Sequence, residues 1–287
     1  MEREWQNLET ETFEAIGTTS LGPRDEQQDA ILLQKGTGVL KSLYVVCDGH
    51  GALGGCSTKC AEMFANHIQL LFEKDPKQTP YAAIRAALQL TDEELCQQLS
   101  EDVESILESW QGESEAKEAL ELLGEDFFRR ELGSGTTLAA VLEHESGLYV
   151  AHVGDSDVYH LSQGTEEIAR CTEPHNWEED EDTVTSEFGV VYKHDLAVAR
   201  ALGHPKLKDA QLLSAWPEIT KLETFETGDF LLLCSDGLIV LTDKEKVDAL
   251  LLFTEEQNLE QAADALMKAA EENPIDNMSI IVLHNKA

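Results

Sequence analysis

Four short apolar segments of this chain each adjoin an aspartate, and this recurring pattern constrains the fold more than any other feature. Three of them run into an aspartate-containing turn and the fourth follows one: Leu43–Cys47 before Asp48-Gly49-His50-Gly51, Phe230–Cys234 before Ser235-Asp236-Gly237, Leu148–Val153 before Gly154-Asp155-Ser156, and Met278–Leu283 after Asp276-Asn277. Short runs rich in aliphatic and β-branched residues predict buried strands. The pattern therefore predicts strands that hold four carboxylates at their ends.

Carboxylates gathered at strand ends indicate a site for a hard cation. A buried aspartate is costly unless it is paired, hydrogen-bonded or bound to a metal. Oxygen ligands of this kind suit Mg²⁺ or Mn²⁺. A tight turn that closes a hairpin is the alternative for Asp48-Gly49-His50-Gly51 taken alone. The presence of an aspartate beside each of four apolar strands favours the metal cluster.

The charge balance excludes several classes of partner. The chain has 287 residues, 42% of them hydrophobic, and a net charge of −35. This length allows one large domain with a sizeable core. So acidic a protein is poorly suited to bind nucleic acid or an anionic membrane surface. Solubility explains most of the charge, and attraction of basic partners is the alternative.

The sequence carries no sign of export or membrane insertion. No stretch approaches the ~20 apolar residues of a membrane helix, and the first residues lack a signal-type apolar segment. The six cysteines form no Cys-x-x-Cys pair, as is typical of a reducing compartment. We therefore expect an intracellular, cytoplasmic monomer without membrane insertion, while a nuclear location stays open.

The order of expected elements predicts an α+β fold with a central β-sandwich of two antiparallel sheets flanked by helices. One domain should fill residues 10–287, after a short extension over 1–9. Helices are expected over 54–73, 81–99, 196–202, 243–252 and 258–272, with a mostly helical, acidic region over 92–131. Paired strands are expected over 218–226 and 229–234, across a turn at Thr227-Gly228.

Seven short motifs together resemble those of a known enzyme family. In chain order they are Arg24-x4-Asp29-Ala30, Val46-Cys47-Asp48-Gly49-His50-Gly51, Ser134-Gly135-Thr136-Thr137, Gly154-Asp155-Ser156, Ala199-Arg200-Ala201-Leu202-Gly203, Ser235-Asp236-Gly237 and Asp276-Asn277. Each is weak alone, but the ordered set resembles the metal-dependent serine/threonine phosphatases of type 2C. The resemblance implies that family's αββα sandwich, with two Mn²⁺ or Mg²⁺ ions at one edge and a possible weak third.

The resemblance also implies the metal ligands. Asp48 would bridge the two ions, the Gly49 carbonyl would bind one of them, and Asp236 and Asp276 would complete the other. Asp155 would contribute to the third. Two neighbouring ions acidify a water and stabilise both oxygens of an in-line displacement.

Three further residues receive roles from the resemblance. Asp29 would support the metal site by positioning a metal-bound water. Arg24 would hold the substrate phosphate, and a guanidinium offers a planar fork that matches phosphate. His50 would be the general acid, because a seryl alkoxide leaves poorly without a proton. Without the resemblance, Arg24 would be interpreted as a surface arginine and His50 as a turn residue.

Four positions depart from the family pattern. Gln28 stands where many members have glutamate, so we expect weaker metal binding. Asp157 and His204 stand where arginine and aspartate are usual, and Val240 replaces an acidic ligand of the third metal in some members.

A long polar segment over about 171–199 corresponds to the family's variable flap beside the active site. Segments of this length are usually functional or disordered. Trp177 within it is expected to anchor the flap through buried area rather than to touch substrate.

The sequence thus predicts a protein phosphatase that hydrolyses phosphoserine and phosphothreonine esters of phosphoproteins without a covalent intermediate. One alternative is a pseudophosphatase that acts as a binding or regulatory module. It would have no need to keep Asp48, Asp236 and Asp276 with Arg24 and His50. A metallohydrolase for small phosphate esters is the third possibility.

Overall fold

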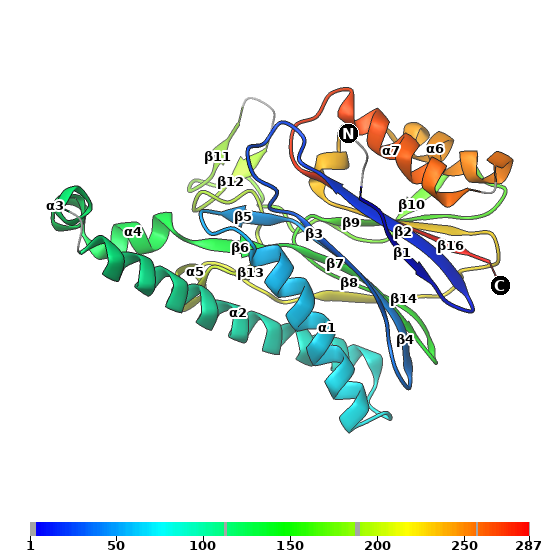
Figure 1. Ribbon diagram of the computed structural model, residues 1–287, viewed down its shortest axis with the longest axis horizontal. Coiled ribbons are helices and arrows are strands. Elements are labelled where there is room, and N and C mark those ends of the chain that lie inside the picture. Colours follow the sequence, from blue (N-terminus) through cyan, green and yellow to red (C-terminus); the bar gives the residue numbers. More distant parts are fainter. Residues whose placement is uncertain (1–3, 112–113, 187–189, 257, 287) are drawn as a thin grey trace.

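Two antiparallel sheets packed face to face form the centre of the computed structural model, which describes residues 4–111, 114–186, 190–256 and 258–286 (Figure 1). The first sheet has the order β1-β2-β16-β15-β9-β10. Its strands are Gln6–Glu9, Phe13–Ser20, Met278–Asn285, Phe230–Cys234, Asp157–Leu161 and Ile168–Arg170. The second has the order β14-β8-β7-β4-β3, with strands Glu218–Leu222, Gly147–Val153, Leu138–His144, Leu40–Cys47 and Ala30–Lys35. The predicted α+β sandwich is confirmed.

The strand β4 shows why the apolar runs are continuous rather than alternating. Tyr44 and Val46 lie in the core between the two sheets, whereas Leu43, Val45 and Cys47 pack in the core beneath the helices. Successive side chains of a strand point to opposite faces. Because both faces of this sheet are covered, every position in the run is apolar.

Two helix pairs cover the outer faces of the sandwich (Figure 1). Helices α1 (Cys56–Lys74) and α2 (Pro80–Trp110) lie on the five-stranded sheet, and α6 (Asp243–Glu256) and α7 (Leu259–Glu271) lie on the six-stranded sheet. The side chain of Thr79 caps α2 by accepting from the Ala82 amide. Helices α3 (Ser114–Leu123) and α4 (Glu125–Glu131) follow α2 at the end away from the sandwich. None of the helices in the described parts of the chain could cross a membrane.

A small third sheet lies at one edge of the sandwich and carries His50. Its order is β13 (Leu202–Gly203), β6 (Ser134–Thr136) and β5 (Gly49–Gly51). The short helices α5 (Pro205–Asp209) and η1 (Asp236–Leu238) follow β13 and β15. A separate hairpin is formed by β11 (Val184–Thr185) and β12 (Val191–Tyr192).

Two expected elements are wrong. The segment 196–202 is extended rather than helical, because Val198 and Arg200 make isolated bridges and Leu202 pairs with Thr136 of β6. The strands near 218–226 and 229–234 do not pair with each other: β14 pairs with β8, and β15 pairs with β9 and β16. The turn between them therefore crosses from one sheet to the other.

Candidate active site

The backbone of Asp48 is held by two threonines of the neighbouring β6–β7 segment. The Thr137 amide and the Thr136 hydroxyl donate to the Asp48 carbonyl at 2.9 and 3.0 Å, and the Asp48 amide donates to Thr137 Oγ1 at 3.1 Å. These bonds fix the residue without using its carboxylate. Sequence reasoning gave the two threonines no role, although their motif was recognised.

Gly49 is a glycine because another backbone passes too close for a side chain. A Cβ at this position would lie 2.3 Å from the carbonyl oxygen of Gln28. The Gly49 amide donates to that same oxygen at 3.1 Å, and the Ser57 hydroxyl also donates to it. The contact joins the Asp48 turn to the segment that carries Asp29.

Four aspartates, the carboxylate cluster, lie near enough to one another for the charge of one to raise the pKa of the next. Burial, with the charges of neighbouring aspartates, raises the pKa of Asp29 and of Asp155 to about 7 and that of Asp48 well above its ordinary value. The pKa of Asp236 is raised by burial too, and its Oδ1 has no hydrogen-bond partner among the described residues. Carboxylates in such surroundings are stabilised by a bound cation. The residue types therefore suit a divalent metal, although no three of these carboxylates have ligand atoms within 4.8 Å of one another.

A serine and an asparagine tie this cluster together. The Ser235 hydroxyl donates to Asp29 Oδ2 at 2.8 Å. Asn277 accepts from the Gln28 amide at 2.9 Å and donates to the carbonyl of Leu21 at 2.8 Å. The loop that carries Arg24 is thus hydrogen-bonded to the turn that carries Asp276.

Arg24 lies at the rim of the cluster and contacts a predicted metal ligand. Its Nη2 is 2.5 Å from Asp276 Oδ2, and 53% of the Arg24 side chain is exposed. No hydrogen bond of its other guanidinium nitrogens occurs among the described residues. A guanidinium has five donors, so donors remain for a phosphate even while this ion pair is kept.

His50 and His204 stack on each other at the edge of the small sheet. Their ring centroids are 4.9 Å apart and their planes are inclined by 16°. Burial lowers the pKa of His50 to about 4, and burial followed by the charge of His50 lowers that of His204 to about 3. The Nε2 atoms of both have no partner within the part of the chain described. Both rings are therefore neutral at pH 7, and an anion close by would raise the pKa of His50.

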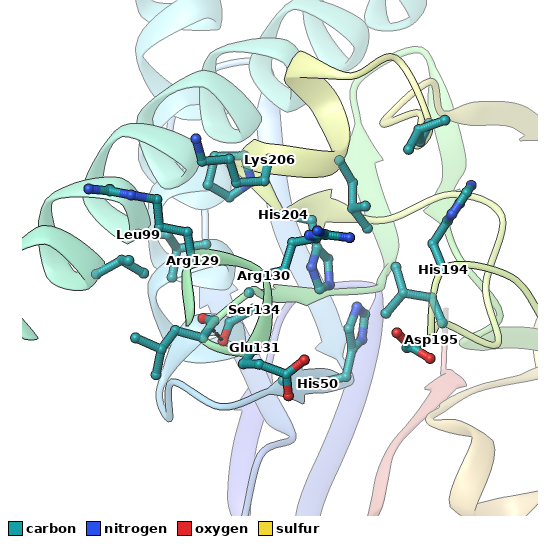
Figure 2. Close-up of a pocket in the computed structure, with 18 of the residues that line it drawn as sticks. His50, Leu99, Arg129, Arg130, Glu131, Ser134, His194, Asp195, His204 and Lys206 are labelled. Carbon is teal, nitrogen blue, oxygen red and sulfur yellow. Dashed lines mark hydrogen bonds between the residues drawn. The ribbon is translucent and has the colours of Figure 1, made fainter. Parts of the chain in front are cut away.

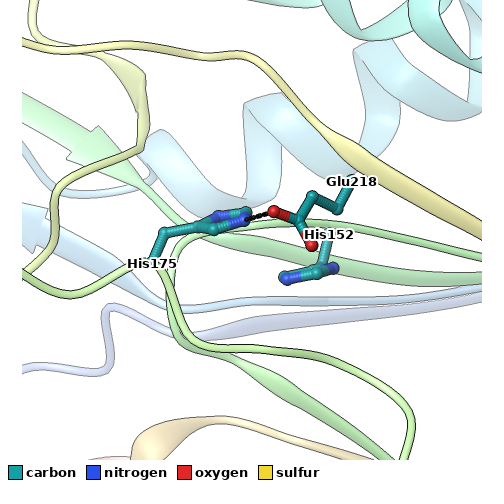
Figure 3. Close-up of side chains that lie close together, drawn as sticks. All are labelled: His152, His175 and Glu218. Carbon is teal, nitrogen blue, oxygen red and sulfur yellow. Dashed lines mark ion pairs between the residues drawn. The ribbon is translucent and has the colours of Figure 1, made fainter.

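A second cluster, formed by His152, His175 and Glu218, has its ligand atoms within 4.8 Å of one another (Figure 3). Among the described residues, no other three His, Cys, Asp or Glu side chains bring their ligand atoms this close together, the four aspartates included. The Gly154 amide donates to His175 Nδ1 at 3.0 Å, so the proton of a neutral His175 is on Nε2, which faces Glu218 at 3.3 Å. His152 Nε2 donates to the Glu173 carbonyl at 2.8 Å. With its proton on Nε2, His175 has no lone pair there for a metal. The cluster instead anchors the residue before Asp155 to the start of segment 171–199.

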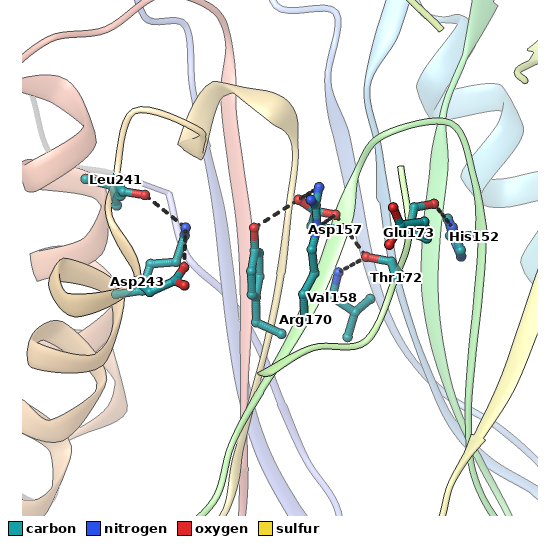
Figure 4. A network of polar contacts seen from close by, with 10 residues as sticks. His152, Asp157, Val158, Arg170, Thr172, Glu173, Leu241 and Asp243 are labelled. Carbon is teal, nitrogen blue, oxygen red and sulfur yellow. Dashed lines mark hydrogen bonds and ion pairs between the residues drawn. The ribbon is translucent and has the colours of Figure 1, made fainter. Parts of the chain in front are cut away.

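Asp157, a departure from the family pattern, has its own cation (Figure 4). Arg170 donates to both its carboxylate oxygens, at 2.7 and 2.6 Å, and the hydroxyls of Thr172 and Tyr159 donate at 2.9 and 3.1 Å. Asp157 also pairs across the ladder with Cys234 of β15. The network fixes the strand that leads to Asp236.

Two other departures also have defined surroundings. Gln28 donates from its amide nitrogen to the Gly51 carbonyl at 3.0 Å, a bond that glutamate could not donate. Val240 packs at the edge of the core beneath α6 and α7.

Trp177 anchors the flap-like segment, as predicted. Its indole donates to the Leu196 carbonyl at 3.1 Å. Its ring packs against a small core formed by Val198, Ala201 and Leu213.

The family model for protein phosphatase 2C matches residues 21–277. Probable protein phosphatase 2C 62 of Oryza sativa subsp. japonica is 30% identical over 254 residues, which cover 84% of this chain and 75% of the relative. Probable protein phosphatase 2C 55 of the same organism is 27% identical over 276 residues, which cover 91% of this chain and 63% of the relative. The chain thus spans less than two thirds of the second relative.

Solved structures share the fold. A C. elegans sex-determining protein has a TM-score of 0.71 at 21% identity, covering 94% of this chain and 64% of its own. The catalytic domain of the phosphatase PstP, solved with two manganese ions, has a TM-score of 0.57 at 18% identity, covering 96% and 99%. Since the family model spans nearly the whole sandwich and its edge site, the chain belongs to the protein phosphatase 2C family.

Proposed function

We propose that this protein is a metal-dependent serine/threonine phosphatase that hydrolyses phosphoserine and phosphothreonine esters of phosphoproteins with no covalent intermediate. The observation that carries the proposal is the cluster of Asp29, Asp48, Asp155 and Asp236, carboxylates that burial first, and the charges of neighbouring aspartates next, make costly to ionise without a bound cation. A fold kept only for binding would gain nothing from such a cluster, which costs stability.

The metal ligands of the proposal are those that the family resemblance implies. Asp48 would bridge two ions, Asp236 and Asp276 would complete the site of one, and the Gly49 carbonyl would bind the other. Asp155 would take part in a weaker third site. When bound, Mn²⁺ or Mg²⁺ would supply positive charge for phosphoryl transfer and would acidify a water.

The remaining groups act on the substrate. Arg24 would turn a pair of donors toward the phosphate, which positions the phosphoryl group and balances part of its charge. Asp29, held by Ser235, would orient the attacking water. His50 would give a proton from its ring to the departing serine or threonine oxygen, once the anionic phosphate has raised its pKa.

The decisive experiment is phosphate release from a phosphothreonine peptide in Mn²⁺, in Mg²⁺ and in EDTA. The wild type should release phosphate only with metal, and Asp236→Asn should release none. Asp248→Asn, an exposed carboxylate of α6 paired with Lys244, is the matched control and should behave as the wild type does. No release from folded wild-type protein with either metal would favour a pseudophosphatase. Turnover of small esters but of no phosphopeptide would favour a small-molecule hydrolase.

The proposal includes an intracellular monomer. The six cysteines are free in the described structure, which is typical of a reducing compartment. Analytical ultracentrifugation of the purified protein tests the oligomeric state. A mass other than that of one chain would contradict the proposed monomer.

A further inference from the structure

A cavity of about 700 Å³ lies directly against the stacked His50 and His204 rings (Figure 2). Its walls come from α2, from α4 and the two residues that join it to β6, from residues 194–196 and from α5. Leu99, Val103 and Leu207 make part of the wall apolar. The cavity is therefore built by chain segments outside the carboxylate cluster.

The position of His50 decides which part of a substrate would reach this cavity. This step rests on the proposed function, in which His50 protonates the oxygen of the departing serine or threonine. Groups beyond that oxygen belong to the peptide. The cavity thus lies on the side of the residues that flank the phosphorylated one, and not on the side of the phosphate.

The charge of the lining departs from that of the whole chain. The sequence has 21 Lys and Arg against 56 Asp and Glu, whereas the lining has three cations, Arg129, Arg130 and Lys206, against Glu131 and Asp195. In Figure 2 the two carboxylates lie on the His50 side, and Arg130 and Lys206 lie on the His204 side. Positive charge is thus concentrated at one end of the cavity.

Two of these cations are available to a ligand. Arg129 is paired with Glu104 and Glu125. In contrast, Arg130 and Lys206 have no ion pair or side-chain hydrogen bond in the described part of the chain. Both are exposed, so they are free to orient toward an anion.

His204 adds a buried and fixed polar atom to the same end. It is 6% exposed, and its Nε2 has no partner among the described residues. Its amide donates to the Ser134 carbonyl at 2.8 Å, and the absence of a side chain at Gly135 makes room for the ring, since a Cβ there would lie 2.8 Å from Nε2. The His204 ring lines the cavity, and a neutral imidazole gives this end a polar wall without adding negative charge.

We infer that this cavity is a subsite for an anionic side chain that flanks the phosphorylated residue of the substrate, held by Arg130 and Lys206 beside the ring of His204. The ligand chemistry is a carboxylate or a second phosphate group. On a surface as acidic as this one, a local pair of free cations is needed to admit such a residue.

The test compares one phosphothreonine peptide with versions that carry glutamate, phosphoserine or glutamine at each nearby position. For the wild type we expect that, at one position, the peptide with glutamate or phosphoserine has a kcat/KM about fivefold higher than the peptide with glutamine. Two exposed ion pairs would give a difference of this size. The double variant Arg130→Gln, Lys206→Gln should bring this ratio to about one. Lys244→Gln, which removes an exposed lysine of α6, is the control and should keep the ratio. The glutamate and phosphoserine arms distinguish the two sources of negative charge.

A ratio of one for the wild type at every position, or a ratio that the double variant keeps, would overturn the inference. Fluorescence anisotropy of the same labelled peptides in EDTA measures their binding without turnover. Should the protein hydrolyse no peptide and no aryl phosphate, the proposed function fails, while anisotropy still shows whether Arg130 and Lys206 give a preference for charged peptides. Should turnover occur without any charge preference, only the subsite fails.

Discussion

Arg170→Gln should destabilise the protein by removing the cation that pairs with Asp157. The side chains are 37% and 12% exposed, and two charge-assisted hydrogen bonds join them. Exposed ion pairs contribute about 0.2–1 kcal/mol, and breaking a buried pair costs about 3–5 kcal/mol. Since Asp157 keeps Thr172 and Tyr159 as donors while Arg170 is partly solvated, we expect a loss of about 2 kcal/mol. For a protein of this size that lowers Tm by about 5 °C.

The assay is urea unfolding of metal-free protein, followed by circular dichroism, for Arg170→Gln, Asp157→Asn and the double variant. With Asp157 neutral, the same arginine substitution should cost only about 0.5 kcal/mol, which gives a coupling energy of about 1.5 kcal/mol. Because Asp157 is buried, the coupling should persist at about 0.5 M NaCl. Equal costs of Arg170→Gln in both backgrounds would refute the reasoning, since the arginine would then act by packing on Tyr159 rather than by charge.

Three further outcomes are expected. Burial raises the pKa of Asp155 to about 7, so the contribution of this residue to the stability of the metal-free protein falls as the pH rises from about 4 through 7. Asp155→Asn should therefore leave Tm unchanged at low pH and raise it above about pH 7, and equal shifts at both would contradict this. Gly49→Ala, whose Cβ would meet Gln28, should cost about 1–3 kcal/mol in urea unfolding, whereas Gly54→Ala, with open space around it, should be near neutral. His50→Ala should lower kcat on a phosphothreonine peptide about a hundredfold and on an aryl phosphate much less, and an equal loss on both would argue against the acid role.

Local chemistry explains which parts of the site could be predicted. Asp48, Asp155 and Asp236 each follow an apolar strand, and a strand buried on both faces has a recognisable sequence wherever it lies. Burial raises the pKa of Asp48, and the charges of Asp236 and Asp155 add to this effect. The ligand atoms of the three do not come within 4.8 Å of one another, so their convergence on a metal stays a prediction. The assignment of each aspartate to a particular ion stays a prediction.

Other features had no local signal. The extended path of 196–202 depends on isolated bridges to Asn176, Lys193 and Ser214, and on the pairing of Leu202 with β6, a strand more than sixty residues earlier. The separation of β14 from β15 depends on the partners that each strand finds in different sheets. The stacking of His204 on His50 joins residues from segments that are far apart in the sequence. Arg170 and Asp157 lie on the neighbouring strands β10 and β9, but only the register of that pair brings their side chains together.

The sequence by itself determined the fold class, the run of buried strands and the residue types at their ends, because periodicity and the cost of burying a carboxylate are properties of short segments. Only the tertiary structure decided which strands share a sheet, which cation neutralises which aspartate, and which end of the cavity beside His50 is positive. Those outcomes depend on contacts between distant segments. Many arrangements have similar local energies, and only the packing of the two sheets and their helices selects one of them.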